Sequence, residues 1–413
     1  MMAAVFAAKH SASVVLLEKN DKLGKKVLIT GKGRCNLTSA EFEIKNLVKA
    51  FGKEGKFLFS AFNAFGPADV IDFFESSGLK TKIERGKRVF PESDKASDVV
   101  KILAKKLKDL KVKIIYNAKV KEFALKKNKI EKIIFNDSEI FAKNYIVCTG
   151  GKSYPATGST GDGYLWLKKM GHKIISPKPS IVPIQIKEQW VKNLQGLDLK
   201  NVELCVFQEN KKKEKVFGEM LFTHFGISGP IVLDISKDVE KYLEKGNVTM
   251  AIDLKPALDF ETLDKRLQRD FQKYQNKNFK NSLDDLLPQK MIEVIVRLSK
   301  IDPEKKVNKI SREERQSLVK LLKRLEFTAE GLMGFDMAIV TSGGVDTKEV
   351  DPKTMKSKLI DNLYFAGEIL AVHGPTGGFN LQQAWSTGFI AGHVVRERRD
   401  RESSSASGEN DNS

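Results

Sequence analysis

The spacing of apolar residues predicts an α/β beginning to the chain. Residues 1–10 have the pattern of a short apolar helix, and residues 13–18 (SVVLLE) that of a buried strand ending in an acid. A loop punctuated by glycine is predicted over 22–39, a helical stretch over 57–77 and an amphipathic helix over 96–110. The other elements predicted here are a hairpin over 79–91 and short strands over 112–116, 120–125, 130–135, 139–141 and 145–149.

The pattern changes after residue 173. Short β runs separated by turns fill 180–253, whereas 256–325 carries leucine stripes at helical spacing and a capping-box pattern at Ser311 and Glu314. Buried strands return toward the carboxyl end. We therefore predict a discontinuous α/β domain over 1–175 and 338–396, a β insert over 176–254 and 326–337, a helical insert over 255–325 and a disordered tail over 397–413.

Composition and charge narrow the choice of function. Lysine and arginine number 71 against 53 acidic residues, which gives a net charge of +18. Such a surplus permits attraction to nucleic acid, anionic membrane or phosphorylated ligands. The lysines are spread over every segment, so a solvated surface explains them and nucleic-acid binding is not favoured. The three cysteines are too far apart for a disulfide framework or a zinc site, which predicts no metal site and a reducing, cytoplasmic location.

An uncharged stretch over 369–395 is long enough to span a bilayer. Its glycines, together with Pro375, Asn380 and two glutamines, would be penalised in hydrocarbon. No secretory signal pattern is found at the start of the sequence. We therefore interpret 369–395 as a buried functional segment and predict no membrane partner.

Glu18, at the end of the first strand, is the first candidate binding residue. In a dinucleotide-binding βαβ unit an acid in this place accepts hydrogen bonds from the adenosine ribose. A solvated glutamate at a strand end is the alternative. The G-x-G-x-x-G turn of such a unit is absent, because the sequence starts inside the helix that the turn would precede.

Two segments that contain glycine can approach a ligand closely. GKGRCNLT (31–38) combines glycines with Arg34 and nearby lysines that could pair with phosphates, although a surface loop would look alike. TGGKSYPATGSTGDG (149–163) follows a buried strand and would place Gly150 and Gly151 at the carboxyl end of a sheet, where open α/β sheets bind ligands. An ordinary strand-to-helix connection is the alternative there.

The strongest candidate segment is LYFAGEILAVHGPTGGFNLQQAWSTGFIAG (363–392). Its buried strand ends in Ala-Gly-Glu, and Glu368 could accept a hydrogen bond from a polyol hydroxyl. Gly377 and Gly378 begin an uncharged helix whose free N–H groups and positive dipole end would stabilise negative charge on a reduced flavin. A buried helix after a glycine turn is the alternative.

Proton donors are harder to identify from sequence. Tyr154, His224 and His373 are candidates, and His224 is also consistent with a purely structural histidine. A Ser–His hydrolase is excluded, because His224 and Ser228 lack the nucleophile-elbow pattern and an orienting acid at readable spacing.

Four motifs in order give the chain its resemblance to a known family. They are GRCNLT (33–38), TGGKSYPATGSTGDG (149–163), GEMLFTHFGISGP (218–230) and YFAGEILAVHGPTGGFNLQQAWSTG (364–388). Through these motifs nearly the whole chain resembles the BaiN/YhiN-type flavoproteins, which are FAD-dependent NAD(P)H oxidoreductases. The resemblance implies a Rossmann-like FAD-binding domain built from both chain ends, a β-barrel-like insert and a nested helical insert.

The resemblance also implies which residues meet FAD. Glu18 would bind the ribose, Val120 would meet the adenine through its backbone, and Glu368 would face the ribityl chain. The other residues that it places beside the cofactor are Arg34, Asn36, Gly150, Gly151, Gly377, Gly378, Asn380 and Leu381.

The implied reaction passes hydride from NAD(P)H through flavin N5 to an unsaturated or carbonyl-type small-molecule acceptor. The rival hypothesis is a truncated, non-catalytic relative that binds RNA or a protein partner through its basic surface. The chain departs from the family pattern in lacking the glycine-rich first loop and in having Lys32 in place of a glycine. We therefore expect the natural reading frame to extend upstream, FAD to bind more weakly without that loop, and a strand to be missing between those ending at Glu18 and Thr149.

Overall fold

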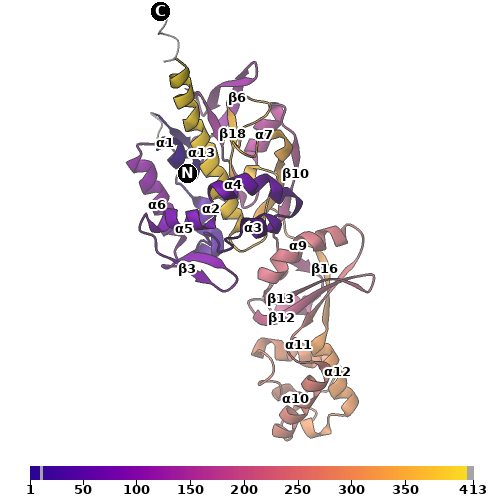
Figure 1. Cartoon of the computed structure of the whole chain (residues 1–413). Coiled ribbons are helices and arrows are strands. Elements are labelled where there is room, and N and C mark those ends of the chain that lie inside the picture. The colour runs from indigo at the N-terminus through magenta and orange to yellow at the C-terminus, as the bar shows by residue number, and fades with distance from the viewer. Residues whose placement is uncertain (10–12, 407–413) are drawn as a thin grey trace, which may run out of the picture. The chain divides into compact units, whose positions relative to one another are not determined.

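The structure is a computed structural model that describes residues 1–9 and 13–406. It divides into two compact units, and Figure 1 labels many of their elements. The first unit comprises Met1–Ser180 and Phe335–Ser413, and the second comprises Ile181–Gly334. The first unit is therefore discontinuous in sequence, because the second is inserted into it.

Short parallel strands form the centre of the first unit. β1 (Val15–Leu17) pairs with β5 (Lys113–Ile115), and β9 (Tyr145–Val147) pairs with β18 (Leu363–Phe365). Within the described residues β1 and β9 share no ladder, which agrees with a strand missing between them. The remaining strands of the unit pair antiparallel, as β2 (Thr38–Ser39) with β4 (Arg88–Pro91) and β3 (Thr81–Glu84), β6 (Val120–Lys126) with β7 (Lys129–Phe135) and β8 (Ser138–Phe141), and β10 (Ile174–Ser180) with β17 (Val340–Val345).

Helices cover this centre. The amphipathic helix predicted over 96–110 is confirmed as α6 (Ala96–Asp109). The long α13 (Phe379–Ala406) packs along α1 (Met2–Ala8), where the rings of Phe6 and Phe389 lie 4.7 Å apart. The shorter helices are α2 (Lys25–Ile29), α3 (Ile44–Ala50), α4 (Phe59–Ala64), α5 (Pro67–Glu75) and α7 (Asp162–Lys169).

Two local predictions for this unit need correction. α2 is helical where a loop was predicted, because Gly24 turns the chain with a φ of 72° and Val27 then packs against an apolar cluster. The helix predicted over 57–77 is split, because Pro67 lacks an N–H and starts a new helix. The disordered tail over 397–413 stays a prediction, and the backbone of α13 runs to Ala406. The rest of that tail, 407–413, lies outside the described residues.

The second unit contains a closed antiparallel barrel. Its strands, in order around the barrel, are β11 (Ile184–Ile186), β14 (Gly226–Ser228), β13 (Lys211–Thr223), β12 (Asp198–Gln208), β15 (Val248–Asp253) and β16 (Leu325–Leu332). The prediction of strands alone over 180–253 was incomplete, because α8 (Gln189–Asn193) and α9 (Pro230–Leu243) also lie there. Ile231, Ile235 and Val239 bury one face of α9 at helical spacing, and Pro230 occupies its first turn.

The helical stretch over 256–325 is confirmed as α10 (Phe260–Lys273), α11 (Gln289–Ser299) and α12 (Arg312–Lys323). The predicted capping box is also present, because Ser311 Oγ accepts from the N–H of Glu314 at 3.2 Å and the Glu314 carboxylate accepts from the N–H of Ser311 at 2.7 Å. One buried apolar cluster runs from Phe222 in the barrel to Leu318 in α12. The division of this unit into two domains at 254/255 therefore stays a prediction. No helix of the described residues is long and apolar enough to cross a membrane.

Candidate functional site

Four of the candidate residues, Glu18, Gly150, Gly151 and Glu368, lie just past the carboxyl ends of β1, β9 and β18. Asn20, just past β1, donates from Nδ2 to the carbonyl oxygen of Thr157 at 3.0 Å. The ammonium of Lys19 lies 2.5 Å from the carboxylate of Asp162 at the start of α7. These contacts join the loops that follow β1 and β9, as expected at the ligand-binding edge of an open α/β sheet.

Glu18 presents a carboxylate at this edge. Its Oε1 accepts hydrogen bonds from the backbone N–H and from Nδ2 of Asn20, both at 2.9 Å. No partner of Oε2 is found among residues 1–9 and 13–406. The carboxylate is therefore oriented by Asn20 and keeps one oxygen for a ligand hydroxyl, although its contact with a ribose stays a prediction.

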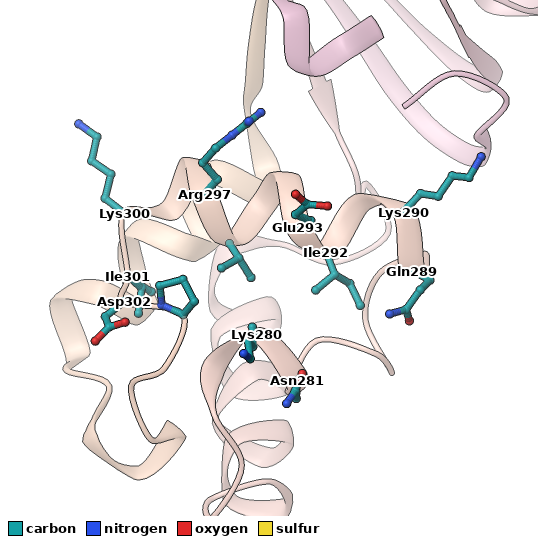
Figure 2. A pocket seen from close by; sticks show the side chains of 12 residues that line it. Lys280, Asn281, Gln289, Lys290, Ile292, Glu293, Arg297, Lys300, Ile301 and Asp302 are labelled. Carbon is teal, nitrogen blue, oxygen red and sulfur yellow. The ribbon is translucent and has the colours of Figure 1, made fainter. Parts of the chain in front are cut away.

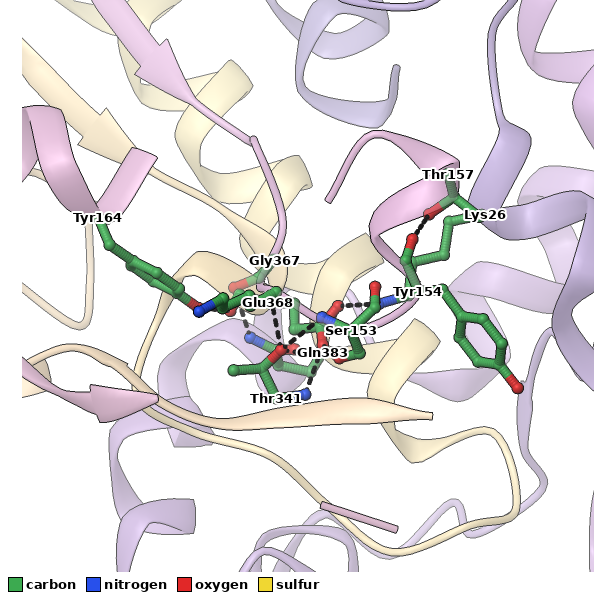
Figure 3. Close-up of polar contacts among 10 residues, drawn as sticks. Lys26, Ser153, Tyr154, Thr157, Tyr164, Thr341, Gly367, Glu368 and Gln383 are labelled. Atoms are coloured by element: carbon green, nitrogen blue, oxygen red, sulfur yellow. Dashed lines mark hydrogen bonds and ion pairs between the residues drawn. The ribbon is translucent and has the colours of Figure 1, made fainter. Parts of the chain in front are cut away.

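Glu368, just after β18, is held by a polar network (Figure 3). Its Oε1 accepts from the N–H of Thr341 at 2.7 Å and from the hydroxyl of Ser153 at 3.0 Å. Its Oε2 lies 2.7 Å from the ammonium of Lys26, which also reaches the carbonyl oxygen of Ser153 at 3.3 Å. The carboxylate is thus fixed in orientation by groups from α2, the loop after β9 and β17.

Gly150 and Gly151 allow the loop after β9 to pack closely. Gly150 has a φ of 72°. A Cβ at Gly151 would lie 2.3 Å from Oγ1 of Thr341, the hydroxyl that accepts from the N–H of Lys152 at 2.7 Å. These glycines therefore permit the Ser153–Thr341–Glu368 network to form.

The predicted glycine turn before α13 is present. Gly377 and Gly378 have φ values of 105° and 96°, and a Cβ at Gly378 would lie 2.4 Å from the carbonyl carbon of Thr38. Asn380 is engaged within the protein, because its side chain accepts from the N–H of Gly374 at 2.9 Å and donates to the carbonyl oxygens of Gly374 and Pro375. It therefore holds the loop that leads into α13. Leu381 packs against an apolar cluster.

Arg34 and Asn36 differ in what they offer a ligand. Arg34 forms ion pairs with Glu84 and Asp94 and covers the ring of Phe90 at 4.1 Å. Its hydrogen bonds with Glu84 and Asp94 raise the pKa of its guanidinium, so its charge is already balanced within the fold. By contrast, the buried Oδ1 of Asn36 has no hydrogen-bond partner in the described part of the chain.

The structure separates the three candidate proton donors. Tyr154 adopts a left-handed conformation (φ 51°) beside Ser153, and its phenol points away from Glu368 (Figure 3). Burial raises the pKa of the Tyr154 phenol. Nε2 of His373 lies 3.3 Å from Oγ of Ser180, whereas His224 is exposed at a turn of the second unit.

Val120, the predicted adenine contact, begins β6 and pairs with Phe135.

Sequence reasoning missed Ser153 and Thr341 and gave Lys26 only a general role as a phosphate cation. Ser153 stands inside the glycine-rich segment 149–163, so its place in the sequence was the available signal. Thr341 and Lys26 gave no such signal, because each joins the network over a long separation in sequence. Lys26 and Glu368, for example, are 342 positions apart.

The sequence is similar to a known protein family and to proteins of known name. The family model described as "HI0933-like protein Rossmann domain" matches residues 1–394. The chain is 33% identical to the "3-dehydro-bile acid delta(4,6)-reductase" of Clostridium scindens, over 96% of this chain and 97% of that protein. It is 32% identical to the "Ribosomal RNA dihydrouridine synthase" of Haemophilus influenzae, over 92% of each.

A solved structure supports the fold. The chain is similar to the 3-ketosteroid delta1-dehydrogenase of Sterolibacterium denitrificans, with a TM-score of 0.51, 12% identity, and coverage of 96% of this chain and 97% of that one. At this identity the similarity concerns the fold alone.

Proposed function

Because the chain belongs to the HI0933-like Rossmann-domain family, the BaiN/YhiN-type flavoproteins, we propose that it is a FAD-dependent reductase that uses NAD(P)H to saturate a carbon–carbon double bond conjugated with a carbonyl group. The observation that carries this proposal is the arrangement at the strand ends. Two oriented carboxylates, Glu18 and Glu368, follow β1 and β18 and are joined by side-chain contacts to the glycine-rich loop 149–163. Gln383 of α13 donates to the carbonyl oxygen of Gly367 at 3.0 Å, so α13 begins at the same edge.

The residues at this edge fit FAD. The buried, unpartnered Oδ1 of Asn36 can accept a hydrogen bond from a bound group. Glu18 and Glu368 provide acceptors for ribose and ribityl hydroxyls, and Lys26 provides a cation beside Glu368. The free N–H groups after Gly377 and Gly378 favour negative charge at the start of α13. When bound, FAD would supply hydride transfer between a reduced nicotinamide and the acceptor.

The choice of acceptor rests on chemistry that two relatives share. The name of the Clostridium scindens protein specifies a Δ(4,6)-reductase, and that of the Haemophilus influenzae protein specifies dihydrouridine. Dihydrouridine is uridine with two hydrogens added to a ring double bond conjugated with a carbonyl group. A double bond of this type therefore fits both names, and hydride addition to it is assisted by the adjacent carbonyl.

The same addition needs a proton. Among the three candidates, Tyr154 has the phenol whose pKa burial raises, so it is protonated at neutral pH and able to donate. Its phenol makes no hydrogen bond within the described residues, which leaves its O–H available to a substrate. His373 and His224 are the other candidates.

A second candidate function differs only in substrate, with a base in RNA as the acceptor in place of a small molecule. Two observations favour it: the net charge of +18, and the printed name of the relative from Haemophilus influenzae. A small-molecule acceptor is favoured by the slightly more identical relative from Clostridium scindens.

The test begins with the colour of the purified protein and with FAD titration. We expect a visible flavin absorption band that is bleached under anaerobic conditions by NADH or NADPH. Reoxidation by a steroid dienone would identify a small-molecule acceptor, and formation of dihydrouridine in unmodified rRNA would identify the second candidate. A protein that binds no FAD, or whose reduced flavin reacts with neither acceptor, would contradict the proposal.

A further inference from the structure

Polar groups that converge on one point are what orient a ligand in a protein site. An open groove of about 890 Å³ along α11 in the second unit is lined by charges of both signs, with Glu293 and Asp302 beside Arg297 and Lys300 (Figure 2). Such a lining selects no single class of ligand. In the first unit, by contrast, buried hydroxyl groups converge on one carboxylate, that of Glu368.

Thr341 of β17 lies at the centre of this arrangement (Figure 3). Its buried hydroxyl oxygen accepts from the N–H of Lys152 at 2.7 Å and from the N–H of Ser153 at 3.1 Å. A hydroxyl group has two lone pairs and one proton, so both lone pairs are in use and the proton is left to donate. Its acceptor is Oγ of Ser153, which lies 2.7 Å away.

The hydroxyl of Ser153 continues this chain of hydrogen bonds to Glu368. Because Oγ of Ser153 accepts from Thr341, its own proton points to Oε1 of Glu368 at 3.0 Å. The backbone N–H of Thr341 donates to the same Oε1 at 2.7 Å. Both lone pairs of Oε1 are therefore occupied, and Thr341 sets one donor directly and the other through Ser153.

Oε2 of Glu368 keeps one position for a ligand. It accepts from the ammonium of Lys26 at 2.7 Å, and no second partner of Oε2 is found among residues 1–9 and 13–406. A carboxylate oxygen has two lone pairs, so one lone pair of Oε2 is available to a ligand hydroxyl. Its direction is fixed, because rotation of the carboxylate would break both hydrogen bonds at Oε1.

We propose that Thr341 is a positioning residue for FAD, which acts through Ser153 and Glu368 to aim the available lone pair of Oε2 at a hydroxyl of the cofactor. This inference rests on the proposed function, which makes FAD the ligand of Glu368. Gly151 leaves room for the arrangement, because a Cβ there would lie 2.3 Å from Oγ1 of Thr341 and 3.1 Å from Oε1 of Glu368. A carboxylate that is oriented before the ligand arrives loses less conformational freedom on binding, which strengthens the affinity.

Fluorescence titration of the full chain with FAD tests the proposal. Thr341→Val keeps the shape of the side chain but removes the hydroxyl, and we expect it to bind FAD about tenfold more weakly. Thr341→Ser restores the hydroxyl and should recover most of the affinity. Ser153→Ala breaks only the link to Glu368 and should weaken FAD binding about threefold, so it tests the proposal even if Thr341→Val does not fold.

Ser357→Ala is the matched control for a purely structural role. The Ser357 hydroxyl is also buried and accepts from two backbone N–H groups, but it contacts His172 instead of Glu368. We expect Ser357→Ala to lower the melting temperature, as Thr341→Val does, and to leave the FAD affinity unchanged. If Ser357→Ala weakened FAD binding as much as Thr341→Val, the proposal would be wrong.

The Glu368→Gln background shows whether Thr341 acts through the carboxylate. In that background Thr341→Val should weaken FAD binding by less than about twofold. The same loss in both backgrounds would overturn the proposal. FAD binding by the unaltered protein with unchanged affinity in Thr341→Val would overturn this inference alone, whereas an unaltered protein that binds no FAD would overturn the proposed function, and with it the role of Thr341.

Discussion

Lys26 shows how one side chain can set the charge at the carboxyl ends of the strands, where we propose that FAD binds. Its ammonium is 2.7 Å from Glu368, and both side chains are largely buried. Replacing it with methionine keeps most of the apolar stem but leaves Glu368 without a counter-charge beside an anionic cofactor. We expect Lys26→Met to weaken FAD binding about tenfold, which corresponds to about 1.4 kcal/mol.

Fluorescence titration with FAD checks this expectation. Lys25→Met is the matched control. Lys25 is next to Lys26 in sequence, but its ammonium pairs with Asp21 at 2.7 Å instead of with Glu368. If both variants bound FAD equally weakly, the affinity would depend on the net charge of the protein and not on the Lys26–Glu368 pair.

His172 links folding of the first unit to pH. Its buried ring lies between the carboxylate of Glu349, 3.0 Å from Nδ1, and the hydroxyl of Ser357, 3.0 Å from Nε2. Burial lowers the pKa of His172 in the folded protein, although Glu349 opposes the shift. As the pH falls, His172 of the unfolded chain therefore binds a proton near pH 6.5, whereas His172 of the folded protein binds it only at a lower pH. The free energy of unfolding should therefore fall as pH drops below about 6.5, by about 1.4 kcal/mol for each unit of the pKa difference.

Urea denaturation at a series of pH values measures this fall. His172→Gln should be less stable at neutral pH but should lose the part of the pH dependence that His172 contributes. His224→Gln, at an exposed site, should keep it. An unchanged pH profile in His172→Gln would contradict the assignment.

At the scale of elements, the start of α13 depends on a close backbone approach. Gly378→Ala places a Cβ 2.4 Å from the backbone of Thr38 and also strains a φ of 96°. Gly171→Ala has a similar φ of 90° but nothing within 4 Å. We expect strain alone to cost about 1–2 kcal/mol in Gly171→Ala and the added clash about 1–3 kcal/mol more in Gly378→Ala.

Thermal melting of the two variants measures the difference, and FAD titration shows whether the displaced turn also weakens the cofactor site. Equal melting temperatures would mean that the Thr38 contact adjusts without cost.

Elements governed by local rules were predictable from sequence. The Ser311 capping box and the apolar stripe of α6 involve residues three or four positions apart, and both are confirmed. α9 was missed because its β-branched residues suit strands as well as helices, and the barrel that it covers selects the helix. At the carboxyl ends of the strands, the glycine motifs indicated which loops meet, but the Lys26–Glu368 pair depends on tertiary structure alone.

At the scale of the whole molecule, the second unit has what independent folding requires. Ile181–Gly334 is one continuous segment with a closed barrel, which leaves no unpaired sheet edge, and with its own apolar cluster. We expect residues 181–334 expressed alone to be monomeric and to unfold in one cooperative transition. Circular dichroism during heating and denaturant titration checks this. A gradual loss of the circular dichroism signal, with no folded baseline before it, would show that residues 181–334 need the rest of the chain to fold.

The pairing of β9 with β18 sets an order of events during protein synthesis. The ribosome makes β9 first and reaches β18 only after the second unit, because β10 and β17 flank that insertion. At about 5–20 residues per second, the amino-terminal part must wait roughly 10–40 seconds for its carboxyl-terminal strand and for α13. During this interval the inserted barrel can fold, whereas β9 stays unpaired with β18. The pairing of β9 with β18, and with it the completion of the first unit, therefore belongs to the end of translation or after it.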